Sequence, residues 1–291
     1  MGMKIARIPR GSPRYPGLLV EAPSPPARLF TLGLPLEPAP FIAVVGTRKC
    51  TSYGISMAKK IAADLTRSGL VVVSGLATGI DAAAHQGALE AGGSTVAVLG
   101  SGIDICYPRR NRHLYDAIKS AGTLVTEYEA GEPPLPHRFP QRNRIIAGMS
   151  IATVIVEAGS GGGAMITSRL AMEMGREVFA IPGPAHSRAS DGPHLLIRDG
   201  ARLVASAAQI LDDLGILPKG SVSQESPGIQ LTIDEALVAR SLESSPMLLD
   251  LISERVGMPA SSVAATLASL ELKGVAMRGP GGRFALSPNG C

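Results

Sequence analysis

Residues 41–75 read FIAVVGTRKCTSYGISMAKKIAADLTRSGLVVVSG, and this stretch decides the fold. It begins and ends with short apolar runs, FIAVVG and LVVVSG, each closed by a glycine. Continuous β-branched runs of this length are typical of strands that are buried on both faces of a sheet. The residues between them, about 53–68, predict a helix. The stretch is therefore expected to form a strand, a helix and a second, parallel strand.

The same rhythm continues along the chain. The further apolar runs are STVAVLG, GTLVTE, IATVIVEAG and EVFAIPG, and helical patterns at about 79–92, 110–120, 141–149 and 163–175 separate or follow them. Alternating strands and helices joined by right-handed crossovers build a doubly wound, mostly parallel α/β sheet. This periodicity alone predicts the fold class.

The chain is expected to divide into four parts. Residues 1–40 are rich in proline and predict an irregular lead-in on the surface of the main domain, which covers 41–214. The stretch 215–230, GILPKGSVSQESPGIQ, has the composition of a linker. Residues 231–291 predict three helices followed by a hairpin with glycine at its tip, VAMRGPGGRFALS. That order of elements indicates a small winged helix.

Composition limits the function only loosely. The chain has 28 Lys+Arg against 24 Asp+Glu, a net charge of +4 that is compatible with a polyanionic partner without proving one. Cys50, Cys106 and Cys291 lack the paired spacing of a zinc site or a disulfide framework, which favours a reducing compartment and predicts no metal. We expect a cytoplasmic protein without a membrane span, since no stretch reaches about 18 consecutive apolar residues.

The loops after the first three strands carry small and basic residues. Arg48 and Lys49 follow Gly46, and a second loop contains Ser74 and Gly75. Arg109, Arg110 and Arg112 follow the third strand. Ligands of open α/β sheets lie outside the carboxyl ends of the strands, where these loops meet. A glycine at such a turn can simply allow a tight bend, but the adjacent cations favour a phosphate.

Asp81 and His85 are four residues apart and therefore share one helix face. An acid beside a histidine can indicate catalysis, yet no Ser or Cys stands at a recognisable nucleophile position. Asp81 can equally cap its helix, so a structural role is favoured.

Two further segments flank the fifth predicted strand. The loop EAGSGGGAMITSRLA places Gly163 and Thr167 at a helix N-terminus, where backbone N–H groups can approach an anion. Before the strand, FPQRNRIIAGM contains Arg142 and Arg144. Either arginine can face the ligand edge, or it can pair with a carboxylate such as Glu127 or Glu157 and clamp the sheet.

Taken in order, these motifs resemble the bacterial DprA/Smf family of DNA-processing proteins. The resemblance runs from RYPGLL at residue 14 to GARLV at 204 and includes VVGTR, SGLATGIDAAAH, AVLGSGIDICYP, RNRIIAG and REVFAIPG. It implies a Rossmann-like domain that binds single-stranded DNA, forms a homodimer and helps load the RecA recombinase during natural transformation. It implies no catalysis, no catalytic residue and no cofactor.

The resemblance also implies site residues. Arg48 and Arg109 would contact phosphates, Phe139 would stack on a base, and Gly163 with Arg144 would complete the pocket. The full set of predicted DNA-binding residues is Gly46, Arg48, Lys49, Ser74, Gly75, Arg109, Arg110, Phe139, Asn143, Arg144, Gly163 and Thr167.

The chain departs from the family pattern at 162–167, where GGAMIT replaces the usual SGSLIT, and at His194, where the family usually has Asn. An alternative function is a nucleotide-processing enzyme of the phosphoribohydrolase type, whose PGGxGTxxE motif the glycine-rich loop superficially resembles. The glutamate of that motif closely follows its threonine, but here Glu173 is six residues beyond Thr167. The third helix of the winged helix has only Lys273 as a base, which argues against sequence-specific duplex reading.

Overall fold

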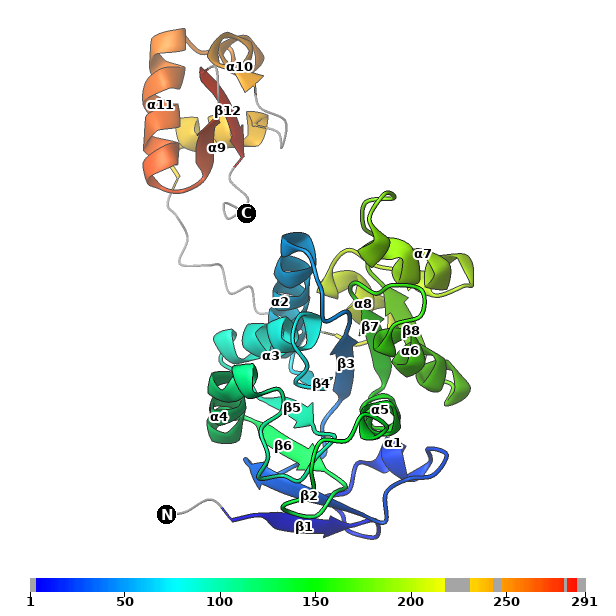
Figure 1. Ribbon diagram of the computed structural model, residues 1–291. Helices are drawn as coiled ribbons and strands as arrows, with labels where there is room; N and C mark the ends of the chain where they lie inside the picture. The colour runs from blue at the N-terminus through cyan, green and yellow to red at the C-terminus, as the bar shows by residue number, and fades with distance from the viewer. Residues whose placement is uncertain (1–3, 218–230, 243–246, 280–281, 287–291) are drawn as a thin grey trace. The chain divides into compact units, whose positions relative to one another are not determined.

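The computed structural model describes residues 4–217, 231–242, 247–279 and 282–286. The chain divides between residues 220 and 221 into two compact units (Figure 1). Within the described residues, no helix has the length and apolar character that crossing a bilayer requires. The predicted linker falls mostly on 218–230 and the predicted hairpin tip on 280–281, so both lie outside the described residues.

The first unit is built on a nine-stranded sheet in the order β1-β2-β6-β5-β4-β3-β7-β8-β9. From β6 to β9 in this order, each strand is parallel to the next. They are β3 (Phe41–Val45), β4 (Val71–Ser74), β5 (Thr95–Val98), β6 (Thr123–Thr126), β7 (Ala152–Ile155), β8 (Glu177–Ala180) and β9 (Arg202–Leu203). The predicted doubly wound, mostly parallel sheet is confirmed.

Helices cover both faces of this sheet (Figure 1). On one face the core includes residues of α1 (Gly17–Val20), α5 (Arg138–Met149), α6 (Gly163–Glu173) and α7 (Asp191–Arg198). On the other face it includes residues of α2 (Ser52–Arg67), α3 (Ile80–Glu90), α4 (Arg112–Ala121) and α8 (Ala207–Asp213). All five residues of β3 are buried, as a central strand between two helical layers requires.

The prediction of an irregular lead-in over residues 1–40 was wrong. This segment contains β1 (Ala6–Pro9) and β2 (Arg28–Gly33), and β2 pairs antiparallel with β6 while β1 pairs antiparallel with β2. The four central residues of β2 are buried. Pro9 is the last residue of an edge strand, a position where the missing N–H is tolerated. The high proline content of residues 1–40 led to the prediction of an irregular segment, although the segment contains two strands that extend the sheet.

The second unit has three helices, α9 (Ile233–Ser241), α10 (Leu249–Val256) and α11 (Ala260–Leu272). A three-stranded sheet follows the order β10-β12-β11, with β10 at Met247–Leu248, β11 at Ala276–Gly279 and β12 at Arg283–Leu286. Val238, Ile252, Val263 and Leu267 form its apolar core. Three helices and a β-hairpin wing are the elements of the predicted winged helix.

Candidate nucleic-acid interface

The strand order reverses at β3. On one side of β3 the sheet continues through β4, β5 and β6, and on the other side through β7 and β8. A reversal of this kind leaves a crevice between the loops that follow the two diverging strands, and open α/β sheets bind their ligands there. The carboxyl ends of β3 and β7 therefore mark the place to look for a site.

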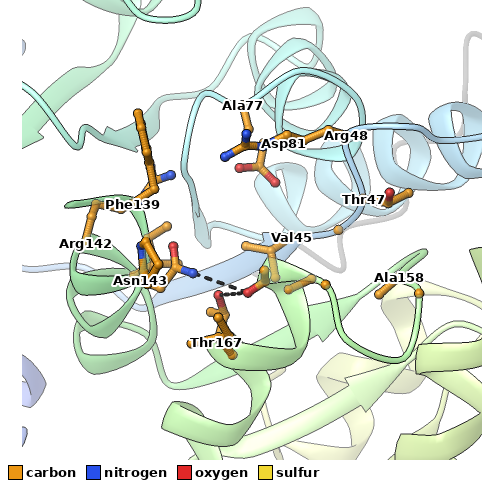
Figure 2. A pocket seen from close by; sticks show the side chains of 18 of the residues that line it. Val45, Thr47, Arg48, Ala77, Asp81, Phe139, Arg142, Asn143, Ala158 and Thr167 are labelled. Carbon is orange, nitrogen blue, oxygen red and sulfur yellow. Dashed lines mark hydrogen bonds between the residues drawn. The ribbon is translucent and has the colours of Figure 1, made fainter. Parts of the chain in front are cut away.

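A cavity of about 540 Å³, here called the main cavity, lies at this reversal (Figure 2). Its volume is in the range of small-ligand sites. Gly46, Thr47 and Arg48 line it from the end of β3, and Ala158 and Gly159 line it from the end of β7. The N-terminus of α6 contributes Gly163, and α5 contributes a row of side chains.

A buried carboxylate holds the β3–α2 loop in place. Glu157, 3% exposed, accepts hydrogen bonds from the Thr51 backbone N–H at 2.9 Å and from the Thr51 hydroxyl at 2.6 Å. Thr51 in turn caps α2 by accepting from the N–H of Gly54. A Cβ atom on Gly54 would overlap the Glu157 carboxylate, so this position has no room for a side chain. The loop that carries Arg48 is thus fixed to the end of β7.

The row on α5 consists of Phe139, Arg142, Asn143 and Ile146, which all line the main cavity. They are spaced three, four and seven residues from Phe139 and so share one face of the helix. Figure 2 shows Phe139, Arg142 and Asn143 on one side of the cavity, with Arg48 and Asp81 across from them. Asn143 and Thr167 both donate to the carbonyl oxygen of Gly163, which ties α5 to α6.

Phe139 is at the centre of a small stack. The Tyr107 ring lies 5.3 Å from its centroid, and the Arg48 guanidinium lies 5.7 Å from it. A guanidinium at this distance from a ring makes a favourable cation–π contact. Ring faces and arginines together form the kind of platform on which nucleic acid bases stack.

Arg142 is the residue that the sequence prediction missed. The predicted set included Arg144, whose guanidinium instead pairs with Glu127 at 2.5 Å and does not line the cavity. Arg142 is only 4% exposed and donates to the carbonyl oxygens of Gly75 and Val98. Arg142 lies three residues after Phe139 and therefore on the same helix face, whereas Arg144 lies about 200° around the helix from Arg142. This spacing was the sequence signal that distinguishes the two arginines.

Other predicted residues fall outside the cavity walls. Ser74 is fully buried and donates its hydroxyl to the carbonyl oxygen of Val44, so it has a structural role in the sheet. Lys49 and Arg109 are exposed and do not line the main cavity. Gly75 and Arg110 line a smaller neighbouring hollow, and the predicted residues that line the main cavity are Gly46, Arg48, Phe139, Asn143, Gly163 and Thr167.

Asp81 and His85 make structural contacts, but the predicted capping role of Asp81 is wrong, because the N-cap of α3 is Gly79 and no side chain caps this helix. Asp81 is 6% exposed and accepts a hydrogen bond from the N–H of Gly75 at 3.1 Å, and burial raises the pKa of its carboxyl while Arg142 opposes that rise. His85 is fully buried, and its Nδ1 donates to the Thr95 hydroxyl, which itself donates to Val72. Burial, with a smaller contribution from the charge of Arg142, lowers the pKa of His85 to about 3 and keeps its imidazole neutral.

Two family models match this chain. Residues 6–215 match the family model of DNA recombination-mediator protein A, and residues 222–282 match that of the DprA winged helix domain. The chain belongs to the DprA family.

Protein Smf of Escherichia coli is 38% identical to this DprA-family chain over 96% of the chain and 77% of its own length. DNA processing protein DprA of Streptococcus pneumoniae is 46% identical over 68% of the chain and 70% of its own length. The X-ray structure of DprA from S. pneumoniae superposes with a TM-score of 0.70 at 43% identity, covering 72% of this chain and 74% of that one.

A solved structure of DNA processing protein A from Helicobacter pylori, titled for its unique single-stranded DNA binding mode, has a TM-score of 0.64 at 28% identity. It covers 68% of this chain and 92% of that chain.

Proposed function

We propose that this chain binds single-stranded DNA in the main cavity, without catalysing a reaction on it. The observation that carries the proposal is the stack of Arg48, Phe139 and Tyr107 beside the buried Arg142 at the strand reversal. Arginines contact the phosphates and the rings stack on bases, which is how proteins bind single strands with little sequence preference. The single-strand binding of the H. pylori relative supports the proposal.

The N-terminus of α6 offers the proposed ligand a second kind of anion contact. The N-terminus of α6 starts at Gly163 after the N-cap residue Gly162, and no side chain caps it. Its first N–H groups are therefore available to an anion, with the helix dipole in the favourable direction. Gly46, Arg48, Phe139, Asn143, Gly163 and Thr167 are the proposed contacts in the main cavity, together with Arg142.

The proposed cellular role follows the family. In it, the protein protects single strands that enter the cytoplasm during natural transformation, acts as a homodimer and loads RecA onto these strands. Sedimentation at micromolar concentration tests the dimer. Displacement of single-strand-binding protein by RecA, with and without this chain, tests the loading.

Binding of a fluorescent single-stranded oligonucleotide, compared with the matching duplex over a salt series, tests the proposed function directly. We expect preference for the single strand and an affinity that falls steeply with salt. Free nucleotides serve as competitors and as substrates. Tight binding or hydrolysis of a mononucleotide, with weak binding of the oligonucleotide, would favour a nucleotide-processing enzyme instead.

A further inference from the structure

A second hollow of about 70 Å³ shares lining residues with the main cavity, Phe139 among them, and is here called the side hollow. Arg48, Tyr107, Phe139 and Arg142 line both spaces, together with Ala77. Ligand cavities usually measure about 300 Å³ or more, so the side hollow is too small for a nucleotide and has room only for a group such as a phosphate.

The walls of the side hollow are strongly cationic. Arg48, Arg110 and Arg142 line it, Thr78 adds a hydroxyl, and its lining residues include no carboxylate. The main cavity differs because Asp81 lines it. Three guanidinium groups around so small a space repel one another unless an anion lies between them. The arrangement therefore indicates an anionic group of the ligand.

Arg142 gives the strongest indication. Its Nη1 atom is held by the carbonyl oxygens of Gly75 and Val98, but its Nε atom is buried without a hydrogen-bond partner. Among the ion pairs within the described residues, none includes Arg142. A buried cation without a paired anion is costly, and proteins usually pair such charges. Arg142 at the side hollow is thus a buried cation that forms no ion pair within 4 Å in the described part of the chain, with Asp81 as a carboxylate that acts on it from the main cavity.

The electrostatics agree with this geometry. Burial lowers the pKa of Arg142 to about 10; the charge of Asp81 is the next largest influence and raises this pKa, and the charge of Arg48 lowers it. Gly75 makes the close approach of the guanidinium possible, since a Cβ atom there would overlap it. Asn111 holds the same loop from its other side by donating to the carbonyl oxygens of Leu76 and Ala77. The arginine and the loop beside it are both fixed before any ligand arrives.

We propose that the side hollow is a subsite for one backbone phosphate of the bound strand, with Arg142 as its buried ligand and Arg110 and Arg48 closing it from the surface. The base next to this phosphate stacks at Phe139, and the strand then continues into the main cavity. This inference rests on the proposed single-strand binding and specifies which cations contact the phosphate.

Arg109 and Arg110 provide a matched pair for the test. Both are exposed and lie in the same short 3₁₀ turn, but only Arg110 lines the side hollow. The variants Arg109→Ala and Arg110→Ala each remove one exposed charge and no buried group, so both variants should fold. Affinity for the single-stranded oligonucleotide is measured from low to high salt. Each phosphate contact adds roughly 0.7 to the slope of log affinity against log salt for a single strand.

We expect Arg110→Ala to reduce the slope by about 0.7 and Arg109→Ala to leave it nearly unchanged. Arg142→Met, checked for folding by its melting temperature, should reduce it at least as much as Arg110→Ala. The second measurement replaces single phosphates of the oligonucleotide by neutral methylphosphonates. One position should cost the wild type about fivefold or more in affinity, in line with a charged hydrogen bond, and cost Arg110→Ala much less.

Equal slopes for Arg109→Ala and Arg110→Ala, or a methylphosphonate penalty that persists undiminished in Arg110→Ala, would overturn the subsite while leaving single-strand binding intact. If the wild type fails to bind the oligonucleotide at any salt concentration, the proposed function fails and the subsite fails with it.

Discussion

The two units of this chain place their cations in opposite ways. In the sheet unit, Arg48 and Arg142 both line two adjoining cavities. Arg142 is buried, and its Nε atom has no hydrogen-bond partner. In the winged-helix unit, the one base at the end of α11, Lys273, forms an ion pair with Glu235 at 2.6 Å. Glu235 also accepts from Ser269 and from the N–H of Thr232 as part of a capping box. The cations of the first unit line the proposed binding site, whereas Lys273 of the second unit supports a helix cap.

This contrast supports a proposed DNA site in the sheet unit rather than on the third helix of the winged helix. A helix that reads a groove normally presents several basic or amide side chains. The exposed positions of α11 include Ser261, Ala264, Ala265 and Ala268. The proposed DNA contacts of this chain therefore lie in the sheet unit, and the following predictions either break or sharpen this comparison.

The largest effect is expected from Arg48→Ala. Arg48 lines both cavities and lies over Phe139, so its loss removes a charged contact and one side of the stack. A hydrogen bond to a charged group contributes roughly 1.5–3 kcal/mol, which predicts a loss of affinity on the order of 100-fold by titration with a single-stranded oligonucleotide. Lys49→Ala, the exposed neighbour outside the cavities, is the control and should lose less than about threefold. Equal losses would mean that only the overall charge matters.

Phe139→Ala should have the next largest effect. Stacking of a base on an aromatic ring contributes roughly 1–3 kcal/mol, so we expect about a tenfold loss of affinity with an unchanged salt slope. Phe139→Tyr keeps the ring and should bind nearly as well as the wild type. A change of slope in Phe139→Ala would show that the ring acts by positioning Arg48 rather than by stacking.

The strands and helices of the sheet unit follow from local pattern. Apolar runs such as FIAVV at 41–45 allow few structures other than a buried strand, and the pattern predicted each strand from β3 to β8. Strands β1 and β2 were missed because β2 is held by pairing with β6, and β1 by pairing with β2, which no local pattern records. Pairing partners distant in sequence are a tertiary property.

The site shows the same division. Arg48 and Phe139 were predicted, since a loop after a buried strand and a ring at the start of a helix must meet at one sheet edge. The predicted site set included Arg144 and not Arg142, although pairing of either arginine with Glu127 was the stated alternative, and the structure shows that Arg144 forms this ion pair. The spacing of three residues between Phe139 and Arg142 places both on one helix face, so it identifies Arg142 as a cavity residue once Phe139 is known to face the cavity. Ser74 similarly required knowledge of its acceptor on β3.

A smaller effect, on stability, is expected in the winged helix at low pH. Hydrogen bonds from Lys273, Ser269 and the Thr232 N–H lower the pKa of Glu235 to about 2, below the value of about 4.3 for an unfolded chain. A depressed carboxyl pKa stabilises the fold above the unfolded pKa, and this stabilisation is lost as the pH falls from about 4.3 to about 2. Thermal unfolding at a series of pH values, followed by NMR resonances of this unit, should show that loss of stability. The variant Glu235→Gln should be less stable than the wild type at neutral pH, and its stability should depend less on pH. Identical pH profiles would assign the capping box no electrostatic role.

The smallest effect is expected from the winged-helix surface itself. Arg240 and Arg283 are exposed cations of this unit, on α9 and on the wing strand β12. If the sheet unit binds the DNA, the double variant Arg240→Ala/Arg283→Ala should change the affinity for a single-stranded oligonucleotide by less than about twofold. The salt slope should also stay unchanged, because each bound phosphate that lost its cation would lower the slope by roughly 0.7. The same titration with duplex DNA is needed, since a wing that contacts a duplex would weaken that complex alone. A clear loss with the single strand would show that the strand extends beyond the sheet unit, and the contrast between the two units would then be one of degree.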